Sequence, residues 1–102
     1  MREIIKQLRS TVSFCGFELE AISSHQNYIS LELSSKKRFR KKNYSLGVSK
    51  SLTGLLTAER ELSRSSKKQL IIFDPVNNLL EPTLGNVLLF HDFDQLQVFL
   101  NK

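Results

Sequence analysis

The chain has 102 residues, of which 40% are hydrophobic and 25% are charged, a composition typical of a globular domain and not of a disordered chain. Its single cysteine, Cys15, excludes an intramolecular disulfide and a cysteine-based zinc finger. No apolar run approaches the about 18 residues of a membrane span, and none of signal-peptide kind follows Met1. We therefore expect no membrane association and a cytoplasmic location, or a nuclear one in a eukaryotic or viral setting.

Positive charge is concentrated in the middle third of the chain. The net charge is +5, but residues 1–35 carry −1, residues 36–68 carry +9 and residues 69–102 carry −3. The densest part is the basic run at 36–42, in which six of the seven residues are lysine or arginine. These like charges repel one another, and an anionic partner would relieve the repulsion.

The first segment, residues 2–15, is predicted to be a helix, because apolar residues recur on one face at Ile4, Ile5, Leu8, Val12 and Cys15. Gly16 suits the position after the helix, where a positive φ ends it. From Phe17 the period changes to two, and residues 17–21 and 29–33 alternate between apolar and polar. With the polar stretch 23–27 between them, they predict an antiparallel hairpin with one solvated face.

A third strand is predicted over residues 38–48. Tyr44, Leu46 and Val48 alternate there with small or polar residues. Phe39 and Tyr44 are separated by an odd number of positions, so both cannot face the core in one regular strand. A bulge or break is therefore required near 41–43.

Helical spacing returns over residues 51–64, although Gly54 inside this helix costs about 1 kcal/mol relative to alanine. The continuous apolar run 70–73 predicts a strand that is covered on both faces and therefore central. Residues 74–78 have turn chemistry, and Leu79 and Leu80 can start a return strand that Pro82 stops. A further buried strand at 87–90 and a final helix at 93–101 follow, the helix capped by Asp92 with Gln95.

The predicted order is therefore α-β-β-β-α-β-(β)-β-α, an α+β fold in a single domain, residues 1–102. We expect an antiparallel or mixed sheet of about five or six strands with three helices on one of its faces. The predicted core contains Ile5, Leu8, Val12, Leu31, Leu55, Ile72, Leu88 and Phe99.

Residues 2–64 resemble a known family. Their order of helix, three strands and helix is similar to the layout of double-stranded-RNA-binding domains. His25 precedes Ile29 by four residues, as that family's loop histidine precedes its strand. The family's glycine, serine and lysine cluster before the second helix is matched by Gly47, Ser49 and Lys50.

The chain also departs from that pattern. The Gly-Pro pair before the histidine is replaced by Ser23-Ser24, and the family's further helix lysines are replaced by Ser51 and Gly54. Residues 69–102 have no counterpart. The resemblance concerns the layout of the first two thirds of the chain.

Residues that could support catalysis are few. There is no glycine-rich phosphate loop, no Gly-x-Ser-x-Gly and no His-Glu-x-x-His motif. The simplest role for Cys15 is a buried thiol, and for His25 it is a solvated loop residue or a ligand contact. Asp74 is most simply a turn residue, and the group His91, Asp92 and Asp94 a helix cap. We therefore expect no enzymatic activity, no cofactor and no metal.

The basic run favours a nucleic-acid-binding module of low sequence specificity, with DNA or RNA as its partner. Cationic side chains on phosphates supply affinity without sequence information, and an aromatic ring among them can stack on bases. The predicted site comprises Lys36, Lys37, Arg38, Phe39, Arg40, Lys41, Lys42, Tyr44 and Lys50, with Lys67 and Lys68 at its margin.

Other roles for the basic run stay open. Lysines on an edge strand prevent pairing between sheets, and a basic run can act as a nuclear localisation patch. The alternative function is a non-enzymatic protein-interaction or regulatory module that docks an acidic protein surface. A homodimer, in which the acidic C-terminal third pairs with the basic third of a second copy, is one form of it.

Overall fold

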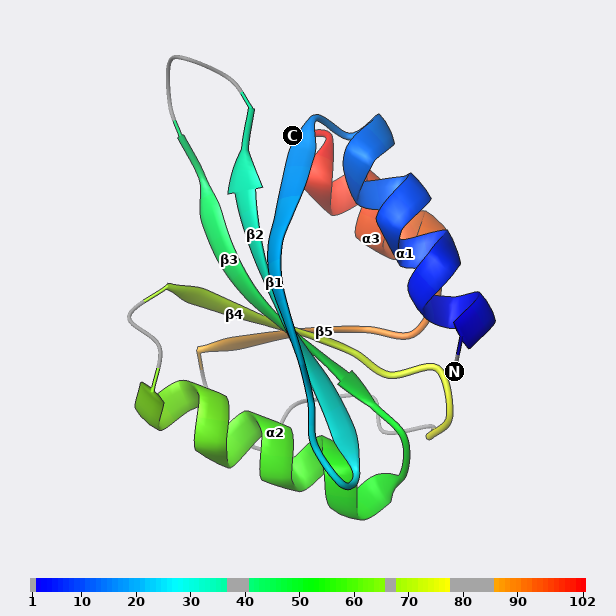
Figure 1. Ribbon diagram of the computed structural model, residues 1–102, viewed down its shortest axis with the longest axis vertical. Coiled ribbons are helices and arrows are strands. Elements are labelled where there is room, and N and C mark those ends of the chain that lie inside the picture. The colour runs from blue at the N-terminus through cyan, green and yellow to red at the C-terminus, as the bar shows by residue number, and fades with distance from the viewer. Residues whose placement is uncertain (1, 37–40, 66–67, 78–85) are drawn as a thin grey trace.

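The computed structural model describes residues 2–36, 41–65, 68–77 and 86–102. It confirms an α+β fold with three helices and a mixed sheet (Figure 1). In chain order the elements are α1 (Arg2–Phe14), β1 (Phe17–Ser24), β2 (Tyr28–Ser35), β3 (Asn43–Ser49), α2 (Leu52–Ser65), β4 (Gln69–Phe73), β5 (Val87–Phe90) and α3 (Phe93–Leu100).

The five strands lie in the sheet in the order β1-β2-β3-β4-β5. Strands β1, β2 and β3 pair antiparallel, whereas β4 runs parallel to β3 and β5 parallel to β4. The optional return strand at Leu79 and Leu80 lies outside the described residues. Among the helices of the described ranges, none is long and apolar enough to cross a membrane.

Helices cover both faces of the sheet, which corrects the expectation of helices on one face. The core on one face joins α1 and α3 to the sheet, and the core on the other face joins α2 to β4. Figure 1 shows α2 on the side of the sheet opposite to α1 and α3. Because β3 and β4 are buried on both faces, cover on one face would leave half of their side chains in water.

The small residues of β3 explain why this was not predicted. Ser45, Gly47 and Ser49 alternate with the apolar residues and read as a solvated face, yet all three are buried. A Cβ on Gly47 would lie 3.0 Å from the side chains of Leu62 in α2 and Ile72 in β4. Small side chains here let α2 approach the sheet closely.

Most of the predicted core is confirmed. Leu8, Val12, Leu31, Leu55 and Ile72 are fully buried. The remaining three residues are half-buried and pack against the cores, namely Ile5, Leu88 and Phe99.

The strand ends differ from the sequence pattern in β1 and agree with it at the start of β3. The register of β1 against β2 shifts between Leu19 and Ala21, so Ile22, not Ala21, pairs with Leu31 across the strands. This bulge ends the alternation predicted for 17–21. Strand β3 begins at Asn43, which agrees with a break near 41–43, while residues 37–40 lie outside the described part of the chain. Gly16 has φ +84° directly after α1, as predicted.

Gly54 is required by a close approach between α2 and the β1–β2 turn. A Cβ at this position would lie 1.8 Å from the carbonyl oxygen of Asn27. That oxygen already accepts a hydrogen bond from the backbone N–H of Lys50 at 2.9 Å. The hydroxyl of Ser51 in turn accepts from the N–H of Gly54 at 3.0 Å and caps the helix. The glycine is therefore a packing requirement and not a weakness of the helix.

We expect Gly54→Ala to destabilise the protein by about 1–3 kcal/mol, the usual cost of forcing atoms into a packed region. Helix propensity alone would predict a gain of about 1 kcal/mol, so the sign of the change separates the two effects. Urea unfolding measures it, with the exposed neighbour Thr53→Ala as the control. A more stable Gly54→Ala variant would show that the turn can move away.

Candidate functional site

The described part of the basic run lies at the end of the β2–β3 hairpin. Lys36, Lys41 and Lys42 are exposed. Two backbone hydrogen bonds of 2.9 Å fix this end of the hairpin. The N–H of Lys36 donates to the carbonyl of Gly16, and the N–H of Ser35 donates to the carbonyl of Lys42. Lys37, Arg38, Phe39 and Arg40 lie outside the described residues, so their predicted roles stay predictions.

Tyr44 is not available to stack on bases, which corrects its assignment to the site. Its side chain is only 8% exposed and belongs to the core between the sheet, α1 and α3. Its ring packs against the rings of Phe17 and Phe99, at centroid distances of 5.7 Å and 5.5 Å. The same burial raises the pKa of the phenol. Tyr44 is a core residue.

A basic groove along α1 brings together cations from separate parts of the sequence. Its volume is about 450 Å³, and its floor contains Ile5 of α1 and Ile29 of β2. Every charged residue that lines it is cationic, namely Arg2, Lys6, Arg9 and Lys50. The first three share one face of α1 because they are spaced at i, i+4 and i+7. Of the predicted site residues that the structure describes, only Lys50 lines this groove.

The groove is electrostatically uncompensated within the described residues. There, none of Arg2, Lys6 and Arg9 forms an ion pair, and Lys50 Nζ donates to the backbone carbonyl of His25 at 3.1 Å. Arg2 and Glu3 both lie in the first turn of α1, and the last turn holds no basic residue. The cation opposes the helix dipole there and the carboxylate favours it. The four cations therefore concentrate positive potential at the groove without a helix-dipole reason for their placement.

A second hollow includes Arg9 of the groove and Lys36 of the basic run. It lies between α1 and β1, has a volume of about 640 Å³ and shares Arg9 with the groove. Lys36 lines it, together with the carboxylates Glu18 and Glu20. Lys36 is therefore the one described member of the run that is connected to the groove, and the two carboxylates make this hollow less favourable for an anion.

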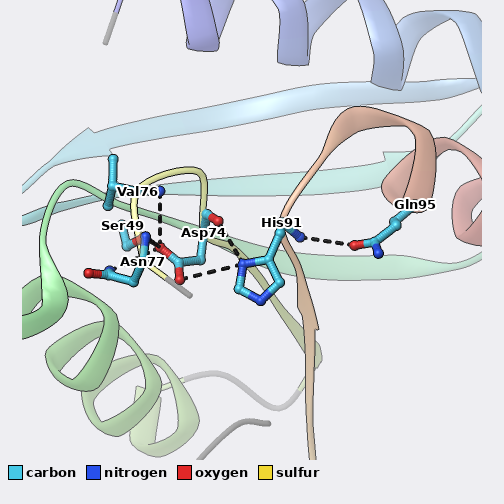
Figure 2. A network of polar contacts seen from close by, with 6 residues as sticks. All are labelled: Ser49, Asp74, Val76, Asn77, His91 and Gln95. Carbon is cyan, nitrogen blue, oxygen red and sulfur yellow. Dashed lines mark hydrogen bonds and ion pairs between the residues drawn. The ribbon is translucent and has the colours of Figure 1, made fainter. Parts of the chain in front are cut away.

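The ends of the three parallel strands carry a buried polar network (Figure 2). Val48, Phe73 and Phe90 are the last residues paired across β3, β4 and β5. The residues that come next, Ser49, Asp74 and His91, therefore lie side by side at this end of the sheet. In open parallel sheets, the carboxyl ends of the strands are the usual place for functional side chains.

Asp74 is the centre of this network. Its carboxylate is fully buried, and Oδ1 accepts hydrogen bonds from Ser49 Oγ at 2.6 Å and from Asn77 Nδ2 at 3.0 Å. Oδ1 also accepts the backbone N–H groups of Val76 and Asn77 at 3.4 Å and 3.2 Å. The carboxylate thus closes the turn after β4 and ties it to the end of β3.

The second carboxylate oxygen faces His91. Asp74 Oδ2 is buried, has no hydrogen-bond partner among the described residues and lies 3.7 Å from His91 Nδ1. The same nitrogen is 3.0 Å from the backbone carbonyl of Asp74, and Figure 2 shows the ring turned toward both oxygens. The N–H of Asp74 donates to the carbonyl of Phe90 at 2.7 Å. These contacts hold β4 and β5 together at their ends.

The other polar candidates have the structural roles expected for them. Asp92 caps α3, its Oδ1 accepting from the N–H of Gln95 at 2.8 Å, while Gln95 Oε1 accepts from the N–H of His91 at 3.1 Å. Cys15 is buried, and burial raises the pKa of its thiol. His25 is exposed and its ring stacks on that of Tyr28, with centroids 4.3 Å apart. No cluster of three metal-ligating side chains occurs within the described ranges.

Tyr28 links the hairpin to α2. Its hydroxyl donates to Glu61 Oε2. Burial, with the hydrogen bond and the negative charge of Glu61, raises the pKa of Tyr28 to about 12. The contact fixes the β1–β2 end of the sheet on α2, next to the turn that Lys50 contacts.

Sequence reasoning missed the cations of α1 and the network around Asp74. The spacing of Arg2, Lys6 and Arg9 is readable from the predicted helix, but the denser run at 36–42 dominates the charge of the sequence. The convergence of Lys50 with them depends on the order of the strands. The contacts of Asp74 depend on the parallel register of β3, β4 and β5, which the sequence pattern does not fix.

Comparisons with protein-family models, with curated proteins and with solved structures return no match to this chain. The layout predicted for residues 2–64 is present as α1-β1-β2-β3-α2. However, β4 and β5 extend the sheet, and α1 and α2 lie on opposite faces. The resemblance to double-stranded-RNA-binding domains therefore gains no support beyond the order of these elements.

We expect Asp74→Ala to destabilise the protein by about 3 kcal/mol, because it leaves the buried hydroxyl of Ser49 and the groups of Asn77 without their acceptor. Asp74→Asn keeps one oxygen in place and should cost less. Urea unfolding of both variants checks this order. The control is Glu18→Ala, which removes an exposed carboxylate from β1. Equal stability of Asp74→Ala and the unmodified protein would contradict the role assigned to the network.

Proposed function

We propose that this protein is a small non-enzymatic module that binds nucleic acid with low sequence specificity through the basic groove along α1. The observation that carries the proposal is the convergence of Arg2, Lys6, Arg9 and Lys50 around one groove without an acidic lining residue. Phosphate groups would replace the counterions of these four side chains, and the release of counterions drives such binding.

The groove provides two kinds of contact. The four cations can each meet a phosphate, which positions the nucleic acid without reading its sequence. The aliphatic floor of Ile5 and Ile29 offers apolar contact to sugars or base faces but no aromatic ring for stacking. We infer low specificity from this combination, since neither contact distinguishes one base from another.

The basic run would extend this surface from the side of Lys36. Lys36 shares a hollow with Arg9, and Lys41 and Lys42 are exposed at the same hairpin end. In this proposal the groove supplies the ordered contacts and the run adds long-range attraction, which raises the rate of association. This function would place the protein where nucleic acid is present, in the cytoplasm or in the nucleus of a eukaryotic or virus-infected cell.

We expect binding to duplex DNA to weaken with salt, with a slope of log K against log salt near −3.6, from about −0.9 for each of the four groove contacts. Replacing Lys6 and Arg9 with Gln should flatten the slope by about 1.8. Fluorescence anisotropy over a series of salt concentrations measures both values, with duplex DNA, duplex RNA and single strands as separate probes. Affinity should fall alike for all sequences.

The matched control is Arg60→Gln with Arg64→Gln, which removes the same charge from exposed positions of α2 on the opposite face. This variant should keep the slope within the error of the measurement. Equal losses in the two variants would mean that net charge alone acts. No binding to any probe at low salt would overturn the proposal, and capture of an acidic protein through Lys6 and Arg9 would then favour the interaction module.

A further inference from the structure

Helix α3 carries an exposed stripe with an acidic end, an apolar centre and a basic end. Asp94 and Val98 are four residues apart and share one face of α3, and Lys102 follows two residues after the end of the helix. All three are exposed, and Val98 is 64% exposed despite being apolar. The same three residues line one groove, so they share a continuous surface.

The groove beside this stripe has an apolar wall. Its volume is about 510 Å³, and it is lined by Leu89 and Phe90 of β5, the last strand of the described sheet, and by Phe99 of α3. These three side chains are half-buried. Val98 and this wall together form an apolar surface with one charged residue at each end.

We propose that two copies of this chain associate through this surface, with their α3 helices antiparallel about a twofold axis at Val98. Asp94 lies one helical turn before Val98, and Lys102 lies on the other side of Val98, beyond the C-terminal end of the helix. An antiparallel copy therefore brings Asp94 opposite Lys102 of the partner subunit, and the twofold axis repeats this contact on the other side. The surface is complementary to itself.

The charges also exclude the other orientation. In a parallel pair, each Asp94 would face Asp94 of the partner subunit, and each Lys102 would face its own counterpart. Like charges at close range are unfavourable, whereas exposed opposite charges add only a little affinity. Burial of Val98 and the groove wall thus supplies the attraction, and the charged ends set the orientation.

The association is independent of the proposed nucleic-acid binding. It uses α3 and β5, whereas the basic groove is formed by α1, Ile29 and Lys50. It also differs from pairing between the acidic and basic thirds of two chains, because both charges of each contact come from the C-terminal helix region. Either proposal can therefore fail without the other.

Sedimentation velocity from micromolar to millimolar protein tests the proposal. We expect a monomer–dimer equilibrium in which Val98→Asp abolishes the dimer. Asp94→Lys or Lys102→Glu, each alone, replaces two attractive contacts by two repulsive ones and should weaken the dimer about tenfold. Mixed in equal amounts, the two variants should recover the affinity, because both contacts of the mixed dimer are again between opposite charges.

The controls are Glu3→Lys and Lys42→Glu, which make the same charge reversals at exposed positions outside the stripe. They should leave the dimer unchanged. Circular dichroism confirms that each variant is folded before its sedimentation is interpreted. A monomer at every concentration would overturn the proposal, and so would a dimer that the single reversals do not weaken or that their mixture does not recover.

Discussion

The burial of β3 on both faces is the constraint on which the rest of the structure depends. From Tyr44 to Ser49 every residue of this strand is buried. The strand must therefore lie inside the sheet, with antiparallel β2 on one side and parallel β4 on the other. It must also have helices on both faces, and Gly47 allows α2 to approach closely enough to form the second core. The parallel connection from β3 to β4 through α2 follows from this packing.

The end of β3 connects both polar features of the molecule. Successive side chains of a strand point to opposite faces. Ser49 accordingly donates to Asp74 in the buried network, while Lys50, the next residue, lines the basic groove with α1. The network holds the carboxyl ends of β3, β4 and β5 together, so the backbone that carries Lys50 is fixed. In the proposed function, the backbone at Lys50 would lose little freedom on binding a phosphate, and the entropic cost would fall on its side chain.

The sequence predicted the elements well because their signals are local. Periods of 3.6 and 2 located the hairpin and the three helices of the described residues, and the continuous run at 70–73 correctly predicted a strand inside the sheet. The errors arose where distant parts of the chain meet. The small residues of β3 have the pattern of a solvent-exposed face although they are buried. Gly54 looks unfavourable in a helix, but its contact with Asn27 requires a glycine. The groove forms because β3 brings Lys50 close to α1.

The two helices on one face of the sheet carry opposite charge. Helix α1 presents Arg2, Lys6 and Arg9 to the groove, whereas α3 begins after Asp92 and holds Asp94 in its first turn. The carboxylates at α3 favour the helix dipole, and so does Glu3 in the first turn of α1, whereas Arg2 in the same turn opposes it. In the proposed function, binding of an anion would give the cations along α1 their role. A polyanion bound at α1, as proposed, would be repelled from the acidic end of α3, and the stripe around Val98 would stay available to a second copy.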